Sequence, residues 1–196
     1  MAGTIDFDKL KNNVDFVIIK AGGSDAGFYK DKNFERNYAE CKRVGIPCGA
    51  YYFVGKNCVT ANDGLADAMR FVEMVKGKQF EYPLYMDCET TPISKRNGAT
   101  DGTIAFCNHL EKCGYYAGIY SSSVLGFKQM LDESRLKRFD LWVACWGNKK
   151  PSTRKAYGMW QNSSTGKIEG INGNVDTDIA YYDFPAIMKN KHLNGF

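Results

Sequence analysis

The chain has 196 residues, of which 44% are apolar and 24% are charged, as in an ordinary globular protein with one sizeable core. Its formal net charge of +4 is too small to indicate nucleic acid as a partner, although it is compatible with an anionic surface. No apolar stretch reaches the ~18 residues of a membrane span, and the N-terminus lacks a signal-peptide pattern. The sequence therefore predicts a single domain over residues 1–196, with no membrane span.

The cysteine pattern argues against a structural metal site. The seven cysteines form no Cys-x-x-Cys pair, and only His109 and His192 could join them as ligands. Their odd number and their positions within apolar runs instead indicate reduced thiols. We therefore expect neither a metal nor an organic cofactor.

The chain opens with alternating helical and strand patterns. A short helix is expected over Ile5–Leu10, followed by a β-branched run over Asp15–Ala21 that indicates a strand buried on both faces. Helical spacing then predicts a helix over Asp31–Val44. The later predicted strands are Cys48–Phe53, Tyr82–Glu89, Tyr115–Ser121, Leu141–Trp146, Tyr157–Gln161 and Asn174–Tyr181.

Three further helical segments lie between these strands. One begins at Thr60, where Asp63 is placed for a capping box, and ends at Gly77. Its expected apolar stripe consists of Leu65, Met69, Val72 and Val75. The other two are a helix from about Asp101 to Cys113 and a helical piece through Phe127, Met130, Leu131 and Leu136.

Seven strands, the first five of them separated by helices, predict an α/β fold with a mostly parallel sheet. Such a sheet either stays open or closes into an eight-stranded barrel, and seven strands are one short of closure. The last three strands are joined by loops too short for full helices. We expect the missing strand to belong before residue 5.

The strand over Tyr82–Glu89 carries the most informative pair of residues. Side chains alternate along a strand, so Asp87 and Glu89 point the same way with Cβ atoms roughly 7 Å apart. Crowding two carboxyl groups drives their pKa values apart, which provides one acid and one anion at the same pH. The simpler alternative is a buried, hydrogen-bonded pair without chemistry.

Several motifs in chain order resemble the glycoside hydrolase family 25 lysozymes, the Chalaropsis-type N-acetylmuramidases of bacteria and bacteriophages. The resemblance covers nearly the whole chain. The motifs are Ile5-Asp6-Phe7, Asp15–Gly22, Asp31-x-x-Phe34-x-x-Asn37-x-Ala39, Gly49-x-Tyr51-x-Phe53, Asp87-x-Glu89, Tyr120-Ser121, Leu141–Ala144, Trp160-Gln161 and Gly170-x-x-Gly173-Asn174-Val175-Asp176.

The resemblance implies a modified TIM-type (β/α)8 barrel, helix-poor in its last third, that cleaves the β-1,4 bond between N-acetylmuramic acid and N-acetylglucosamine in peptidoglycan. Glu89 matches the general acid, Asp87 a neighbouring carboxylate that stabilises positive charge, and Asp176 an acid that orients the substrate or tunes its neighbours. Strand-end aromatics that match the sugar groove are Tyr51, Tyr120, Trp146 and Trp160. For Asp176 the alternative is a turn or capping carboxylate, and for the aromatics it is core packing.

The N-terminus departs from the family pattern. Family members begin with a strand and an active-site aspartate, where this chain has only Met1-Ala2-Gly3 before Thr4. We therefore expect an N-terminally truncated catalytic domain without a wall-binding domain, whose open edges recruit a second copy. Without a visible signal peptide, we expect it to reach the cell wall after release by lysis.

Two other functions compete with the muramidase. A barrel that lacks one active-site acid is expected to bind peptidoglycan while its catalysis is impaired. A chitinase-like barrel is disfavoured because the single Asp-x-Glu lacks the longer acidic run of that family. Retention or inversion of the anomeric configuration stays open, because a same-strand pair fits either separation.

Overall fold

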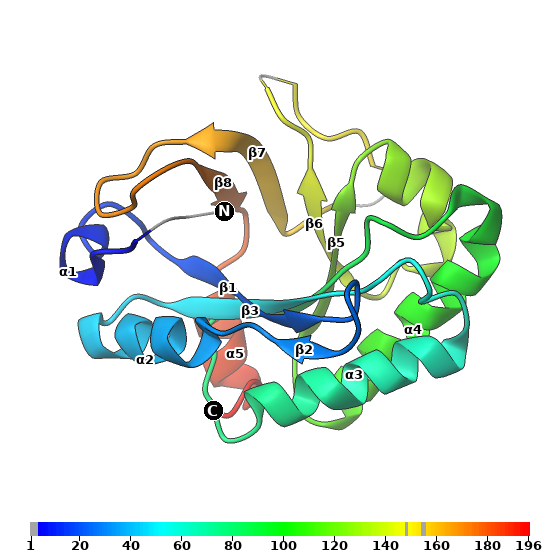
Figure 1. The fold of residues 1–196 in the computed structure, drawn as a ribbon, viewed down its shortest axis with the longest axis horizontal. Coiled ribbons are helices and arrows are strands. Elements are labelled where there is room, and N and C mark those ends of the chain that lie inside the picture. Colours follow the sequence, from blue (N-terminus) through cyan, green and yellow to red (C-terminus); the bar gives the residue numbers. More distant parts are fainter. Residues whose placement is uncertain (1–3, 148, 154–155) are drawn as a thin grey trace.

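The computed structural model describes residues 4–147, 149–153 and 156–196. Eight strands form one curled sheet, a half-barrel, in the order β2-β1-β3-β4-β5-β6-β7-β8 (Figure 1). Their bounds are β1 (Val17–Gly23), β2 (Tyr29–Lys30), β3 (Cys48–Phe53), β4 (Leu84–Asp87), β5 (Ala117–Ser122), β6 (Asp140–Ala144), β7 (Met159–Gly166) and β8 (Val175–Ala180). All seven predicted strands are confirmed, and the two-residue β2 is an addition.

The six strands β1 and β3 to β7 are parallel to one another, and β2 and β8 pair antiparallel at the two ends of the sheet. Three helices connect the first parallel strands and lie along one side of the sheet (Figure 1). These helices are α2 (Phe34–Val44), α3 (Ala61–Val75) and α4 (Arg96–Lys112). The predicted α/β class with parallel crossovers is therefore confirmed.

The start of α3 was predicted correctly, but its buried face was not. Thr60 caps the helix as expected, because its hydroxyl accepts a hydrogen bond from the Asp63 amide and donates one to the Asp63 carboxylate. That carboxylate also accepts from the Val59 amide, one residue before the position that a standard capping box uses. The expected stripe is wrong at Leu65 and Met69, which are both exposed. Gly64 lies on the buried face instead. At this position α3 approaches α4 so closely that a Cβ would collide with the Gly102 carbonyl oxygen. Close helix packing, rather than side-chain size, selects this face.

Helix α4 begins five residues before its predicted start. A 3-10 turn η1 (Ile93–Lys95) leads directly into it, and it continues through the weak helix formers Asn97 and Gly98. Gly98 packs directly against the carbonyl of Val59, so tertiary contact overrides local propensity here. The predicted helical piece after β5 is a π-helix, η2 (Leu125–Met130), followed by a 3-10 turn, η3 (Glu133–Arg135).

The last third is helix-poor between its strands, as expected. The segment 167–174 that connects β7 and β8 contains no helix. A short C-terminal helix, α5 (Phe184–Lys191), was not predicted. Asp183 caps this helix by accepting a hydrogen bond from the Ala186 amide, and Phe184 packs on Tyr82 and Tyr116. It therefore covers one end of the curled sheet.

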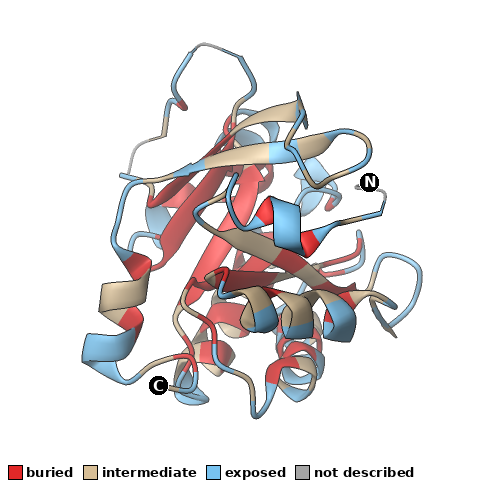
Figure 2. Ribbon diagram, turned by 90° about the vertical axis from the view of Figure 1, so that its left-hand side faces the viewer, coloured by how far each residue is buried: buried red, intermediate tan, exposed pale blue. Residues whose placement is uncertain are grey.

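The outer strands of the half-barrel do not pair with one another. The N-terminal helix α1 (Phe7–Leu10) follows a single bridge between Ile5 and Ile171, and this bridge attaches residues 4–6 to the β7–β8 connection. Buried residues concentrate on the central strands and on the helix faces beneath them, whereas the β7–β8 hairpin is largely exposed or intermediate (Figure 2). Within the described residues, no helix is both long and apolar enough to cross a membrane.

The two faces of the sheet have different chemistry. The helix-covered face contributes a mainly aliphatic and phenylalanine-rich core. The concave face gathers a smaller, aromatic cluster that includes Tyr82, Tyr85, Tyr120 and Trp142. The predicted acids lie beside this aromatic cluster.

Candidate active site

The predicted acid pair lies at the carboxyl end of β4. Asp87 is the last residue of the strand, and Glu89 follows two positions later. The Cys88 amide continues the ladder by donating to the Tyr120 carbonyl at 3.0 Å, while the Cys88 thiol lies 3.9 Å from the Met130 sulfur in the helix-side core. Asp87 and Glu89 therefore extend from the opposite, concave face, as strand alternation predicts.

Asp87 is a buried acid without full hydrogen bonding. It is only 5% exposed, and its Oδ1 is the one buried side-chain nitrogen or oxygen in the described part of the chain that has no hydrogen-bond partner. Burial and the Glu89 charge raise the pKa of Asp87 well above its ordinary value. A buried carboxyl group without hydrogen-bond partners lowers the stability of the fold. Such groups are typical of functional sites.

Glu89 and Asp176 lie at the solvent side of the same cluster. Both residues are exposed, yet partial burial of the carboxyl group raises the pKa of each. The Asp176 charge raises the pKa of Glu89 further, so β8 brings its acid close to the end of β4. The fold thus assembles all three predicted acids.

Lys20 of β1 acts on two of these acids. Its Nζ lies 4.9 Å from the ring centroid of Phe53, and its charge lowers the pKa of both Asp87 and Glu89 against the larger effect of burial. Lys20 was not among the predicted site residues, although a lysine in the middle of an apolar strand was a usable signal.

Two of the predicted aromatic residues line the acid cluster. Burial and the nearby charges of Asp87 and Asp176 raise the pKa of Tyr51 far above its ordinary value, and burial and the Glu89 charge do the same for Tyr120. The Tyr120 hydroxyl donates to Gln161 Oε1 at 2.9 Å. Both phenols therefore stay protonated beside the acids.

Trp142 and Asp178 complete the floor beneath these phenols and were not predicted. The Trp142 ring centroid lies 4.5 Å from that of Tyr120 and 6.2 Å from that of Tyr51. Its indole nitrogen donates to Asp178 Oδ1 at 2.7 Å. Burial raises the pKa of Asp178 to about 7, despite this hydrogen bond. The alternation Asp176-x-Asp178 on β8 was the available sequence signal.

The two remaining predicted aromatics occupy different places. Trp146 is 62% exposed and donates its indole N–H to Gln161 Oε1 at 3.0 Å, the same oxygen that Tyr120 uses. Trp160 is buried and donates to the Cys145 carbonyl at 2.8 Å. Because Gln161 faces the acid cluster, its neighbour Trp160 points to the other face of β7 and supports the Trp146 loop.

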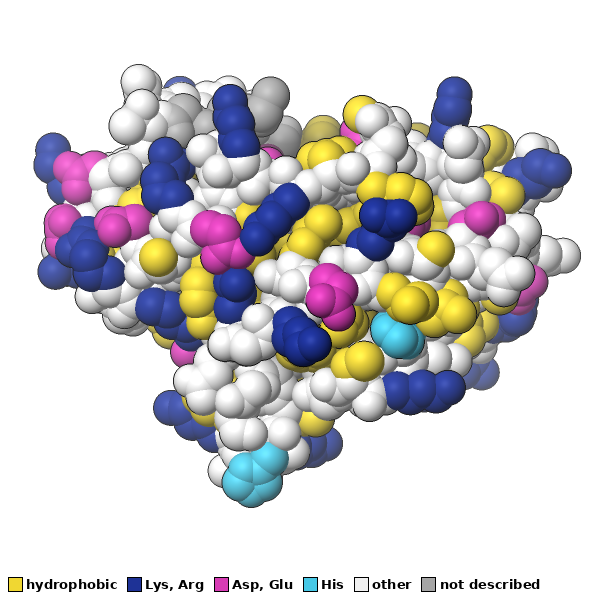
Figure 3. Space-filling view, turned by 60° about the horizontal axis from the view of Figure 1, so that its bottom comes forward, with side chains coloured by type: hydrophobic (Ala, Val, Ile, Leu, Met, Phe, Trp, Pro, Cys, Tyr) yellow, Lys and Arg dark blue, Asp and Glu magenta, His cyan; other side chains and the backbone are white. Residues whose placement is uncertain are grey.

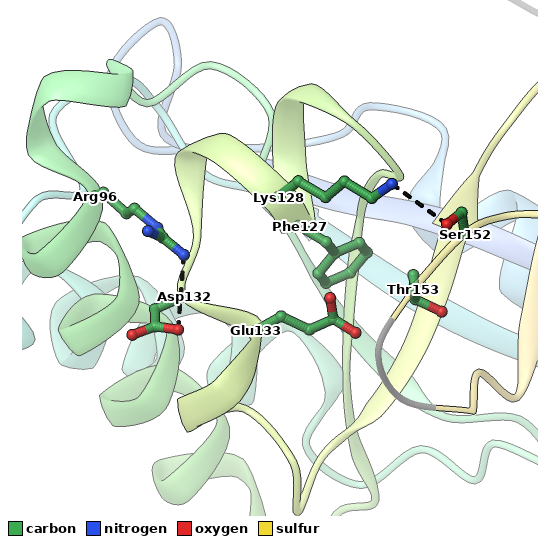
Figure 4. A pocket seen from close by; sticks show the side chains of 7 residues that line it. All are labelled: Arg96, Phe127, Lys128, Asp132, Glu133, Ser152 and Thr153. Carbon is green, nitrogen blue, oxygen red and sulfur yellow. Dashed lines mark hydrogen bonds and ion pairs between the residues drawn. The ribbon is translucent and has the colours of Figure 1, made fainter.

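A cavity of about 330 Å³ lies between η2, η3 and the β6–β7 connection, and Asp87, Glu89 and Asp176 are not among the residues that line it (Figure 4). Its charged side chains have partners, since Arg96 pairs with Asp132 at 3.6 Å and Lys128 bonds Ser152 at 3.3 Å. In the described ranges, no group of three or more histidine, cysteine or acidic side chains could hold a metal ion.

Comparison with known proteins identifies relatives of this chain. It is 27% identical over 177 residues to the "Autolytic lysozyme" of Clostridium acetobutylicum, a match that covers 90% of this chain and 52% of that protein. The chain therefore spans about half the length of that relative.

Solved structures share the fold. The CTP1L endolysin superposes with a TM-score of 0.81 at 26% identity, covering 96% of this chain and 66% of the endolysin. The autolysin LytC from Streptococcus pneumoniae, in complex with a synthetic peptidoglycan ligand, superposes with a TM-score of 0.78 at 27% identity, covering 91% of this chain and 44% of LytC.

A protein-family model also matches most of the chain. The model for glycosyl hydrolases family 25 matches residues 1–171, which include β1 to β7, Asp87 and Glu89. With this match and a half-barrel that solved endolysin and autolysin structures share, we conclude that the chain belongs to glycosyl hydrolases family 25.

Proposed function

We propose that the chain is a lysozyme that hydrolyses the β-1,4 bond between N-acetylmuramic acid and N-acetylglucosamine in peptidoglycan. The observation that carries this proposal is the pairing of a buried Asp87 with an exposed Glu89 at the end of β4. Family membership supports it, as do relatives described as an autolytic lysozyme and an autolysin with a synthetic peptidoglycan ligand.

Glu89 is the proposed general acid. Its carboxyl group reaches solvent, so a glycosidic oxygen can approach it, and its raised pKa keeps it protonated at a higher pH than an ordinary glutamate. It donates its proton to the leaving oxygen as the bond to the anomeric carbon breaks. The nearby Asp176 charge supports this role because it opposes loss of that proton.

Asp87 is the proposed stabiliser of the positive charge that develops at the sugar. It lies behind Glu89 in a buried, low-dielectric environment, where a carboxyl group interacts strongly with a charged or polar sugar group. The Lys20 charge favours its anionic form, whereas burial favours its protonated form. Substrate that reaches Asp87 with a partial positive charge shifts this balance toward the anion.

Asp176, Tyr51, Tyr120 and Trp146 are the proposed substrate contacts. Asp176 lies on β8, its charge acts on Glu89, and it is proposed to orient the sugar. The Tyr120 and Trp146 groups share Gln161 Oε1 as acceptor, so both aromatic side chains are held in fixed positions beside the acids. Pre-organised aromatic surfaces suit the apolar faces of sugar rings.

The experiment that tests this proposal compares Glu89→Gln with Glu169→Gln, a control at an exposed acid on the β7–β8 connection. Digestion of purified cell walls is followed by turbidity and by identification of the new reducing ends. We expect muramic acid reducing ends from the parent and the control, and a loss of activity of about 10²-fold to 10⁴-fold in Glu89→Gln.

Other outcomes separate the alternatives. New glucosamine reducing ends from walls, or faster release from chitin, would replace the proposed bond with another. Wall binding without any new reducing ends in the parent would instead support the impaired, peptidoglycan-binding barrel. The open side between the two ends of the sheet, β2 and β8, is the structural feature that favours this second candidate.

A further inference from the structure

Three neighbouring loops beside the acid cluster expose both large apolar side chains and lysines. Ile93 and Lys95 follow β4, Leu125 and Lys128 follow β5, and Trp146 and Lys149 follow β6. We call these six residues the rim shelf. Ile93, Leu125 and Trp146 are 50%, 58% and 62% exposed, which is unusual for side chains of this size in one region.

The rim shelf is continuous because its three loops are attached to one another. The Ser123 amide donates to the Ala144 carbonyl at 2.9 Å, which joins the loops after β5 and β6. Lys128 reaches Ser152 of the loop after β6, and η1 contacts η2. All three loops leave the carboxyl ends of adjacent parallel strands and so lie on one edge of the sheet.

The rim shelf also continues into the proposed active site. Trp146 bonds Gln161, which in turn accepts the Tyr120 hydroxyl beside Glu89. Groups that project sideways from a sugar chain lying over the acids would therefore contact the rim shelf.

The charge of the rim shelf is opposite to that of the acid cluster. In the sequence, segments 88–95, 123–130 and 145–153 contain no acidic residue except Glu89. The acids that follow the second segment, Asp132 and Glu133, line the same cavity as Lys128, and Asp132 pairs with Arg96. On the face seen in Figure 3, by contrast, basic side chains are interspersed with acidic ones. The site thus combines acids at its floor with a basic, apolar rim.

We propose that the rim shelf binds the acidic peptide stems that hang from the muramic acid units of the glycan. This inference rests on the proposed function, because it assumes that the glycan lies over Asp87 and Glu89. The stems carry carboxylates that match the three lysines and methyl groups that match the apolar side chains. Charged residues at the rim of a site affect the rate of association with substrate and KM more than they affect the rate of the chemical step.

The test uses two substrates: intact glycan strands that carry their stems, and strands from which an amidase has removed them. Two variants remove parts of the shelf, Ile93→Ser/Leu125→Ser and Lys95→Glu/Lys128→Glu/Lys149→Glu. The matched controls are Met69→Ser on α3, which is 53% exposed, and Lys112→Glu at the end of α4. Trp146 is left intact because it also holds Gln161.

We expect KM for the stem-bearing strands to rise about fivefold to tenfold in each shelf variant, with kcat unchanged, and the controls to match the parent. KM for the stripped strands stays at the parent value. The parent's KM for stem-bearing strands should also rise with salt, and this salt dependence should disappear in the triple lysine variant.

Equal losses on both substrates, or no loss on either, would overturn the proposal. So would a parent dimer in sedimentation that the shelf variants convert to monomer, because the shelf would then bind a second copy. A parent that cuts neither substrate refutes the proposed function itself, and direct binding of the isolated stem peptide then decides the shelf independently.

Discussion

Strand β3 places two adjacent tyrosines on opposite faces of the sheet, and each lies near a buried aspartate. On the helix side, the Tyr52 hydroxyl donates to Asp67 Oδ1 at 3.1 Å, and Ser24 donates to Asp67 Oδ2 at 3.1 Å. On the concave side, Tyr51 lies near Asp87, whose Oδ1 has no partner in the described residues.

The pKa of both aspartates is raised by burial, so burial alone does not distinguish them. The two aspartates differ in their hydrogen bonds. Asp67 is satisfied by two hydroxyl groups from β3 and from the end of β1, so it connects the sheet to α3 as a structural acid. Asp87 is left unsatisfied beside two other acids and a lysine, which is the arrangement of a group that interacts with substrate. Five substitutions test the difference between the two faces.

The largest expected effect is that of Asp87→Asn on activity. We expect kcat to fall roughly 10²-fold, because an electrostatic stabiliser of the transition state is lost. The melting temperature at pH 7 should be unchanged or higher, because a buried carboxyl group with a raised pKa destabilises the folded state there. Wall digestion and thermal unfolding check this. A large fall in melting temperature would make Asp87 a structural acid like Asp67.

Asp67→Ala should instead lower the stability of the fold and leave activity nearly unchanged. It leaves the Tyr52 and Ser24 hydroxyl groups without their acceptor, which costs about 1–3 kcal/mol of unfolding free energy. The melting temperature should fall by about 2–4 °C for each kcal/mol. At 25 °C we expect kcat to remain within about twofold of the parent, as for changes outside a site. A loss of kcat with normal stability would contradict the comparison.

Asp178→Asn tests the pH dependence. A carboxyl group with a pKa of about 7 in the folded state binds more protons there than in the unfolded chain between about pH 4 and 7, so its stabilising effect is lost as the pH rises. The parent should therefore be more stable at pH 5 than at pH 7.5, by roughly 2–3 kcal/mol from this group. The asparagine variant keeps an acceptor for Trp142 and should show a smaller difference in denaturant melts. An unchanged difference would mean that Asp178 titrates normally.

The smallest effects are expected from the two tyrosines. Tyr51→Phe should lower kcat/KM about threefold to tenfold without affecting stability, through loss of a single polar contact to substrate. Tyr52→Phe should lower the unfolding free energy by about 1 kcal/mol and leave kcat/KM unchanged. If both variants lose activity equally, then the two faces of β3 do not differ in function.

Much of the fold could be predicted because its signals are local. The apolar, β-branched runs identified every long strand, and the Thr60–Asp63 capping pattern identified the start of α3. The alternation of Asp87 and Glu89 identified a shared face. Errors occurred where packing between distant segments decides, as with Gly64 against Gly102 and Gly98 against Val59.

For the site, the sequence by itself determined the acids on β4 and β8, the flanking Tyr51 and Tyr120, and the family pattern that connects them. Only the tertiary structure decided which groups surround them. Lys20, Trp142 and Asp178 come from three separate strands, and nothing in their local sequence shows that the curl of the sheet brings them together. Likewise, Asp67 and Asp87 are equally acidic residues in the sequence, and only the folded chain supplies hydroxyl partners to one and leaves the other without them, because hydrogen-bond satisfaction depends on contacts across the sheet.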